Sequence, residues 1–276
     1  MSKSASERVV AHGFLLLLAL VALVPLIGIA LTALNGSSRP PSGFAIPTEW
    51  TLDNFAGAWK KGKFGLSLRN SLIIAVITVI GTTILASLAG YAFAISRFRY
   101  RNAVFMLFLV GLVVPSEAII VPLYYDIREY LPFIRGSHAV IILPQIGKYL
   151  AFGAFWMRAA FSAIPHEISE AARVDGASGR QTFALVMLPL VKPALLTLAV
   201  LVFMWSWNDF LLPLVMLANS TNLQTAPLSL AAFSGQRTTD VVGLSAGALV
   251  VAVPIIVFYI VFQRQLIRGV LHGALQ

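Results

Sequence analysis

Residues 71–95 read SLIIAVITVIGTTILASLAGYAFAI, a run of 25 residues without one acidic or basic side chain. An α-helix needs about 20 predominantly apolar residues to cross the hydrocarbon core of a bilayer. In lipid, a single segment pairs all of its own backbone N–H and C=O groups only as a helix. The stretch Ser71–Ile95 therefore predicts a membrane-spanning α-helix.

Five other stretches are long and apolar enough for the same interpretation. The sequence therefore predicts an all-α, polytopic membrane protein with six transmembrane helices. The first stretch follows Lys3 and Arg8, as the apolar part of a secretory signal would, but its length favours a retained helix. The five stretches are Phe14–Leu34, Ala103–Ile120, Ala139–Phe161, Val191–Leu217 and Gly243–Phe262.

The composition agrees with a chain in lipid. Hydrophobic residues make up 58% and charged residues 11% of the chain, and the mean hydropathy is +0.85. A soluble domain carries about a quarter charged residues, so this chain lacks the polar surface to face water on all sides. The absence of cysteine excludes disulfides, zinc–thiolate sites and a thiol nucleophile. The net charge of +9 favours anchoring at membrane surfaces over binding of nucleic acid.

Basic residues between the spans set the expected orientation, because cytoplasmic connections carry an excess of Lys and Arg. With the N-terminus inside, the inner connections are slightly more basic, and the short segment 97–101, RFRYR, is the clearest inner connection. The even number of spans then places both termini in the cytoplasm. The outer connection 35–70 is also basic and departs from the rule.

Three parts of the chain are expected from these features. Residues 1–70 hold the first transmembrane helix and a polar, turn-rich external loop, and residues 71–265 form the core domain. Residues 266–276 form a cytoplasmic tail. Within the core domain, the connection 162–190 is long and polar enough to have structure of its own.

The connection 162–190 predicts two short cytoplasmic helices that are separated near Gly176. Pro165 suits the start of a helix, and Glu167 lies in the first turn, where a carboxylate favours the helix dipole. Gly176 suits a helix end in left-handed backbone, and Pro189 limits the second helix. Such a pair fits docking on a soluble partner, and it equally fits an amphipathic connector on the membrane surface.

This connection also carries a pattern of fixed spacing that consists of Glu170-Ala171-Ala172, Gly176, Val186 and Leu188-Pro189. It resembles the signature of the permeases of binding-protein-dependent ABC importers, with valine where isoleucine is commonest. In that family the connection docks on the ATPase subunit. The resemblance therefore implies an ATPase-coupling role for Glu170, Ala171, Ala172, Asp175, Gly176, Ala177, Leu188 and Pro189.

Further motifs extend the likeness over most of the chain, among them Asn70-Ser71, Gly90-Tyr91-Ala92, Pro122-Leu123, Trp207-Asn208-Asp209 and Gln263-Arg264. Together they resemble the carbohydrate branch of the family, the maltose-type permeases of the bacterial inner membrane. The resemblance implies the type I importer fold, a second permease subunit, a cytoplasmic ATPase dimer that binds ATP and magnesium, an extracytoplasmic solute-binding protein and a sugar substrate. The chain ends in GALQ rather than the Lys-Gly common in that branch, which leaves a contact of the tail with the ATPase open.

Ionisable and aromatic side chains within the spans are candidates for a substrate pathway, because a charge at membrane depth is costly and is usually functional or paired. Aromatic rings stack on sugar faces, and amides and carboxylates accept hydrogen bonds from hydroxyls. Structural alternatives remain: a tryptophan near a membrane end is usually an interface anchor, Asp209 pairs with a backbone group or a neighbouring helix, and Lys148 faces water or neutralises Glu117. The candidates are Glu117, Lys148, Trp205, Trp207, Asn208 and Asp209.

The chain lacks the motifs of an ATPase or a metalloenzyme. It has no phosphate-binding loop of the form Gly-x-x-x-x-Gly-Lys-Ser/Thr, and its four histidines are scattered, so no metal or cofactor is expected in this chain. We therefore expect a non-catalytic permease that works by alternating access, with ATP hydrolysis in separate subunits.

Three alternatives stay open. The first is an importer permease for another solute, such as a polyamine or a glycerol phosphate, although a phosphate cargo would favour more arginines inside the spans. The second is a secondary transporter, which needs a relay of buried carboxylates and has only Glu117 and Asp209 for it. The third, a membrane enzyme, is disfavoured because the sequence has no polar catalytic cluster.

Overall fold

The computed structural model describes residues 5–37, 46–217, 220–235 and 238–274. Within these ranges the chain is helical, with two isolated β-bridges and no β-strand, so the all-α prediction is confirmed. Four of the described helices are long and apolar enough to cross a membrane, and six spans result if each of two sharply bent helix pairs is counted as one.

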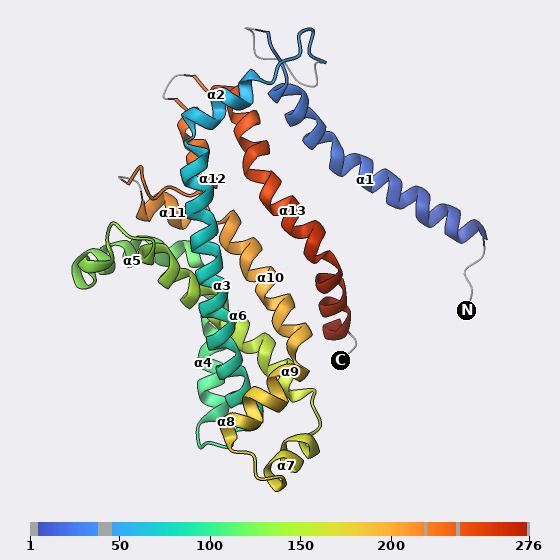
Figure 1. Cartoon of the computed structure of the whole chain (residues 1–276), viewed down its shortest axis with the longest axis vertical. Coiled ribbons are helices and arrows are strands. Elements are labelled where there is room, and N and C mark those ends of the chain that lie inside the picture. Colours follow the sequence, from blue (N-terminus) through green and yellow to red (C-terminus); the bar gives the residue numbers. More distant parts are fainter. Residues whose placement is uncertain (1–4, 38–45, 218–219, 236–237, 275–276) are drawn as a thin grey trace. The chain divides into compact units, whose positions relative to one another are not determined.

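The chain divides into two compact units, which are Met1–Gly65 with Ser229–Pro254 and Leu66–Leu228 with Ile255–Gln276. The expected division into 1–70, 71–265 and 266–276 stays a prediction. In chain order the helices (Figure 1) are α1 (Ala5–Ala33), α2 (Asp53–Lys61), α3 (Phe64–Ile95), α4 (Arg101–Val113), α5 (Ser116–Tyr130), η1 (Pro132–Ile134), α6 (Ala139–Ser162), α7 (His166–Val174), α8 (Gly179–Gln181), η2 (Thr182–Met187), α9 (Leu188–Leu190), α10 (Lys192–Asn208), α11 (Leu211–Met216), α12 (Ala226–Ser229), η3 (Leu230–Phe233) and α13 (Val241–Ala274).

The first unit contains α1, which is apolar on all sides. Its large apolar side chains between Val9 and Ile27 are 45–72% exposed, as expected of a helix that faces lipid rather than a protein core. At its end, the amide of Asn54 donates hydrogen bonds of 2.9 Å to the carbonyls of Ala33 and Asn35. Asn54 therefore ties the polar segment after α1 to the first turn of α2.

The core of the second unit lies where α3, α6 and α10 pack together. Glycines allow the close approach of α3 and α6: a Cβ atom on Gly90 would lie 2.6 Å from Cβ of Met157, and one on Gly153 would lie 2.7 Å from Cβ of Ala86. Small residues at such contacts are typical of membrane helices, because packing rather than hydrophobicity drives their association. The buried cluster at this contact consists of Ala86, Tyr149, Met157, Phe161, Met187, Val191, Leu198 and Val202.

The start of α3 is fixed by polar contacts inside the second unit. Asn70 donates to the carbonyls of Asn222 and Gln224 at 2.9 and 3.1 Å, and its carbonyl oxygen lies 3.0 Å from Nε2 of His138. Burial, and next the positive charge of Arg69, lower the pKa of His138 below its ordinary value, which favours the neutral ring. The helix begins at Phe64, earlier than the expected Ser71, and Asn70 is hydrogen-bonded within the unit rather than solvated.

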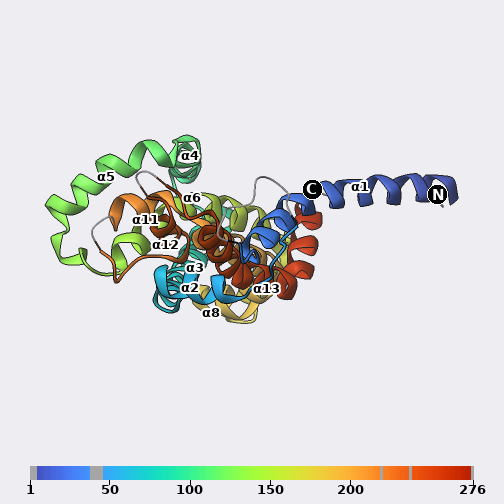
Figure 2. The same cartoon turned by 90° about the horizontal axis from the view of Figure 1, so that it is seen from above.

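The predicted third span, Ala103–Ile120, is wrong as a single helix. The helix α4 ends at Val113, and α5 begins at Ser116 in a direction 98° away. Pro115 has no N–H to continue the helix and disfavours helical backbone in the residue before it; Val114 and Pro115 are accordingly extended, with ψ of 123° and 119°. Figure 2 shows α5 running sideways from the end of α4.

The predicted fifth span, Val191–Leu217, is also divided. The helix α10 ends at Asn208, Asp209 is extended with ψ of 117°, and the short α11 begins at Leu211. Before α10, the segment Gly179–Leu190 meets it at 76°. The apolar run thus begins at a bend and is interrupted at Asp209, and hydropathy alone reveals neither.

Candidate functional site

The first half of the coupling connection forms α7, as the sequence predicts. Pro165 precedes the helix in extended backbone with ψ of 134°, and Glu167 lies in the first turn. The helix is two-sided: Ser169 and Ala172 are 5% and 8% exposed, whereas Glu170 and Ala171 lie on the exposed side. A small residue beside a carboxylate is thus presented to solvent on a short helix.

Gly176 ends α7 in the left-handed conformation, with φ of +84°. The N–H of Ala177 donates to the carbonyl of Ala172 at 2.9 Å, and the N–H of Gly176 donates to the carbonyl of Arg173 at 3.1 Å. This pair of bonds is the Schellman motif, which satisfies the last carbonyls of a helix and favours glycine at the position of positive φ. The predicted break at Gly176 is confirmed.

The second half is one irregular helix made of α8, η2 and α9. Ser178 and Gln181 form a capping box at its start, and residues 182–187 form a π-helix. In the π-helix, Met187 is fully buried, and the ring of Phe183 lies 5.0 Å from that of Tyr91 on α3. The second helix is therefore anchored in the core of the second unit.

The eight predicted coupling residues differ in how far they are exposed. The exposed residues are Glu170, Ala171, Asp175, Gly176 and Pro189. The partly exposed residues are Ala177 and Leu188, and the buried one is Ala172. Leu188 packs on the core cluster of α3, α6 and α10, whereas Glu170 and Ala171 face solvent. Their role in docking an ATPase stays a prediction.

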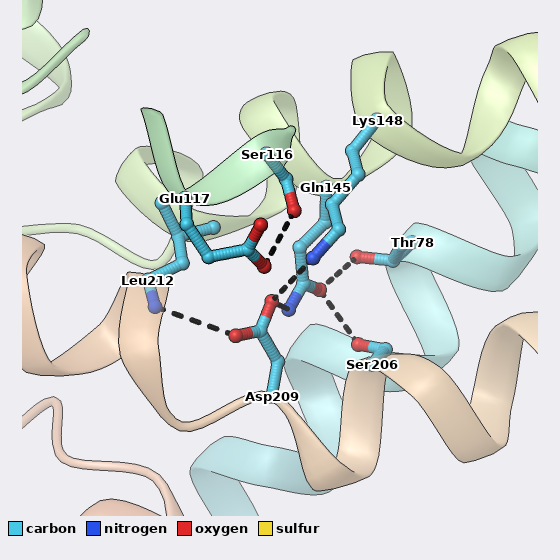
Figure 3. A network of polar contacts seen from close by, with 8 residues as sticks. All are labelled: Thr78, Ser116, Glu117, Gln145, Lys148, Ser206, Asp209 and Leu212. Atoms are coloured by element: carbon cyan, nitrogen blue, oxygen red, sulfur yellow. Dashed lines mark hydrogen bonds and ion pairs between the residues drawn. The ribbon is translucent and has the colours of Figure 1, made fainter. Parts of the chain in front are cut away.

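A second polar site lies inside the second unit, centred on Gln145 of α6 (Figure 3). Its side chain is fully buried. The carbonyl oxygen accepts hydrogen bonds from the hydroxyls of Ser206 at 2.6 Å and Thr78 at 3.2 Å, and the amide nitrogen donates to Oδ2 of Asp209 at 3.2 Å. One amide thus joins α3, α6 and the break between α10 and α11.

Asp209 occupies this break and is held from three sides. Besides Gln145, its Oδ1 accepts from the backbone N–H of Leu212 at 3.3 Å, in the first turn of α11. Its Oδ2 lies 3.8 Å from Nζ of Lys148, and the two side chains are 7% and 38% exposed respectively. A buried carboxylate requires such partners, so Asp209 stabilises the break in the helix.

The other candidates of the predicted pathway are placed differently from one another. Glu117 is exposed and accepts a hydrogen bond of 2.9 Å from the hydroxyl of Ser116, while the ion pair of Lys148 is with Asp209. Asn208 is exposed and donates to the carbonyl of Met204 in its own helix at 2.9 Å. Lys148 and Asp209 therefore come together, and Glu117 and Asn208 make only local bonds among those that the structure describes.

The two tryptophans have different surroundings. Trp207 is 3% exposed and stacks on Phe203 with ring centroids 5.7 Å apart, so it belongs to the core. Trp205 is 37% exposed, with its ring 5.6 Å from Tyr149 and 5.0 Å from Phe152. Of the two residues, only Trp205 has a large exposed fraction.

The sequence reasoning missed Thr78, Gln145 and Ser206, which are neutral and therefore do not stand out in a search for charges. One signal was present for Gln145, because it precedes Lys148 by three residues and so shares its helix face. No group of three potential metal-ligating side chains occurs in the ranges that the structure describes.

Comparison with known proteins places this architecture in a family. Residues 83–272 match the family model described as "Binding-protein-dependent transport system inner membrane component". The trehalose transport system permease protein SugB of Mycobacterium tuberculosis is 34% identical over 257 residues, which cover 92% of this chain and 93% of SugB. The diacetylchitobiose uptake system permease protein NgcG of Streptomyces coelicolor is 29% identical over 96% of this chain and 87% of its own length.

The fold has a counterpart among solved structures. A chain of a bacterial ABC transporter involved in the import of the acidic polysaccharide alginate superposes with a TM-score of 0.76 at 22% identity, over 96% of this chain and 99% of that chain. The helical architecture with its bent spans, the family match and the relatives agree with one another. The chain therefore belongs to the inner-membrane components of binding-protein-dependent transport systems, and it is a membrane-spanning permease subunit of an ABC importer.

Proposed function

We propose that this permease forms, with a second permease subunit, the pathway for a sugar that an extracytoplasmic binding protein delivers. The observation that carries the proposal is the 34% identity to a trehalose permease along 92% of the chain. Relatives named for diacetylchitobiose and arabinooligosaccharides support the same substrate class. We place the chain in a bacterial inner membrane with both termini in the cytoplasm.

The exposed face of α7 is the proposed contact with an ATPase subunit. Glu170 offers a carboxylate to a basic group, and Ala171 beside it permits close approach of a partner's backbone. The irregular helix that follows is anchored through Phe183 and Met187, so a displacement of α7 would reach the core of the second unit. ATP and magnesium are expected in the ATPase dimer, because this chain has no phosphate-binding loop.

Four of the pathway candidates have two different roles in this proposal, one structural and one in contact with the sugar. Asp209 is hydrogen-bonded and Trp207 is packed on Phe203, so both stabilise the end of α10. Lys148 and Trp205 are over one-third exposed, and they combine a cation with an aromatic face. A sugar in the pathway would meet these two side chains rather than the buried carboxylate.

Uptake of labelled sugars by the host strain tests the proposal. A strain that lacks this chain should lose uptake of one sugar, with trehalose as the first probe, and the wild-type chain should restore it. Glu170→Lys should insert normally yet abolish uptake, because a lysine would repel the basic group that Glu170 is proposed to meet. Glu129→Lys, the same charge change on exposed α5, is the matched control and should transport normally.

Two results would count against the proposal. Unchanged uptake by Glu170→Lys would reject the docking role of α7. Unchanged uptake of a broad panel of mono- and oligosaccharides in the strain that lacks the chain would reject sugar as the substrate class.

A further inference from the structure

The connection between α3 and α4 carries a cluster of arginines that the transport function does not use. Arg97, Arg99 and Arg101 follow the end of α3 at Ile95 within six residues. Residues 97–103 line an open depression of about 680 Å³. Arg158 of α6 adds a fourth guanidinium, 3.8 Å above the ring of Phe105 on α4. We call these four arginines the basic cluster.

None of the four arginines of the basic cluster belongs to an ion pair found in the described ranges. The sequence contains no Asp or Glu between Asp53 and Glu117, and the two ion pairs found in the described ranges involve only Lys61 and Lys148. Arg101 makes one long contact of 3.5 Å to the carbonyl of Ser96. Arg101 also repels Arg158. Positive charges gathered in this way attract an anion, and arginine is the side chain best suited to bind phosphate oxygens in pairs.

The surface next to the basic cluster is apolar. On α4, Met106, Leu107 and Val110 are 61%, 70% and 56% exposed. Within the connection itself, the rings of Phe98 and Tyr100 are 43% and 62% exposed. A basic depression at the start of a helix with exposed apolar side chains matches a molecule with an anionic head and an acyl tail.

We propose that the basic cluster and the exposed face of α4 bind an anionic phospholipid, with its phosphate between Arg97, Arg99 and Arg101 and an acyl chain along α4. Basic pockets between membrane helices are known to hold such headgroups. Because the chain is a membrane permease, the lipid is always at hand. The proposal needs neither the sugar nor the ATPase contact.

Native mass spectrometry of the full chain in mild detergent measures this binding. Phosphatidylglycerol is the anionic probe, and phosphatidylcholine is the zwitterionic comparison. Arg97→Gln combined with Arg99→Gln should weaken phosphatidylglycerol binding by roughly 30-fold, since each basic side chain near a lipid surface contributes about one factor of five. Binding of phosphatidylcholine should be weak and unchanged.

A matched pair of substitutions tests whether location matters. Arg128→Gln with Arg135→Gln removes the same charge from another depression of the second unit and should leave phosphatidylglycerol binding within about threefold of wild type. Equal losses in both double variants would show that net charge alone attracts the lipid and would overturn the proposal. If the glutamine pair fails to insert, Arg97→Lys with Arg99→Lys decides, because it keeps the charge but loses the paired donors of arginine. Phosphatidylglycerol binding should then fall, and unchanged binding would show that net charge alone attracts the lipid and would overturn the proposal.

The same experiments distinguish the lipid from two other ligands of the basic cluster, a soluble phosphate compound and an ATPase subunit. Free glycerol 3-phosphate, which has the headgroup chemistry without the acyl chains, should not displace the lipid at millimolar concentration; displacement would show a site for soluble phosphate instead. If the glutamine pair keeps phosphatidylglycerol but no longer co-purifies with an ATPase subunit, the basic cluster is a protein contact and the lipid site is refuted.

Discussion

Replacing Gln145 by leucine removes the amide that joins α3, α6 and α10 while it keeps a side chain of similar size. The amide makes hydrogen bonds to Thr78, Ser206 and Asp209. Hydrogen bonds between membrane helices contribute about 0.6 kcal/mol each on average and about 1.7 at most. The bond to the buried carboxylate of Asp209 should lie near the upper value, because ionic partners strengthen hydrogen bonds. We therefore expect Gln145→Leu to lower the free energy of unfolding by about 3 kcal/mol.

The assay is equilibrium unfolding of the purified chain in mixed micelles, followed by tryptophan fluorescence. Gln263→Leu is the matched control, because its amide donates to the carbonyl of Ile260 in the same helix at 3.0 Å. It should change the free energy of unfolding by less than about 0.5 kcal/mol. If Gln145→Leu is as stable as this control, the polar site does not stabilise the packing of the three helices.

Three further substitutions follow from the structure. Gly90→Ala should destabilise the chain by about 1–3 kcal/mol, because the added Cβ would lie 2.8 Å from the backbone of α6. Gly147→Ala should leave the stability unchanged, because the added Cβ would have no atom of another part of the chain within 4 Å. A thermal scan in detergent compares the two variants, and equal melting temperatures would contradict the close packing at Gly90. Gly176→Ala should destabilise the end of α7 by about 1–2 kcal/mol, because alanine would be strained at the φ of +84° that Gly176 adopts. Proteolysis at this end of α7 should become faster, and an unchanged cleavage rate would refute the need for glycine. In the first unit, hydrogen bonds from Lys61 and the N–H of Gly243 lower the pKa of Asp240, so its stabilisation is present above its unfolded pKa near 4 and is lost as pH falls through its lower folded pKa. Asp240→Asn should differ from wild type by less than about 1 kcal/mol at pH 7, and the difference should shrink in acid; a difference that grows in acid would contradict this assignment.

The sequence was sufficient where one property decides the structure. Continuous apolar runs predicted the helices around Ser71–Ile95 and Ala139–Phe161, because backbone pairing in lipid leaves no other choice. Gly176 predicted the end of α7, because only glycine takes positive φ without strain. The fixed spacing around Glu170 predicted the family, which the comparisons confirm.

The sequence was insufficient where a helix bends or is interrupted. Hydropathy is averaged along the chain and does not depend on the direction of a helix. Ala103–Ile120 was therefore expected to be one span, although Pro115 interrupts it. The break at Asp209 depends on Gln145 of α6, which lies 64 residues away in the sequence, as well as on the nearby N–H of Leu212. The π-helix 182–187 and the bonds of Gln145 likewise require knowledge of which helix faces meet.

The most direct test of the importer assignment is purification of the tagged chain from its native membrane in mild detergent, with mass spectrometry of the proteins that accompany it. We expect an ATPase, a second permease and, with substrate present, a solute-binding protein. Recovery of the chain alone, in a detergent that keeps other membrane complexes of the same cells intact, would contradict the assignment and favour a secondary transporter.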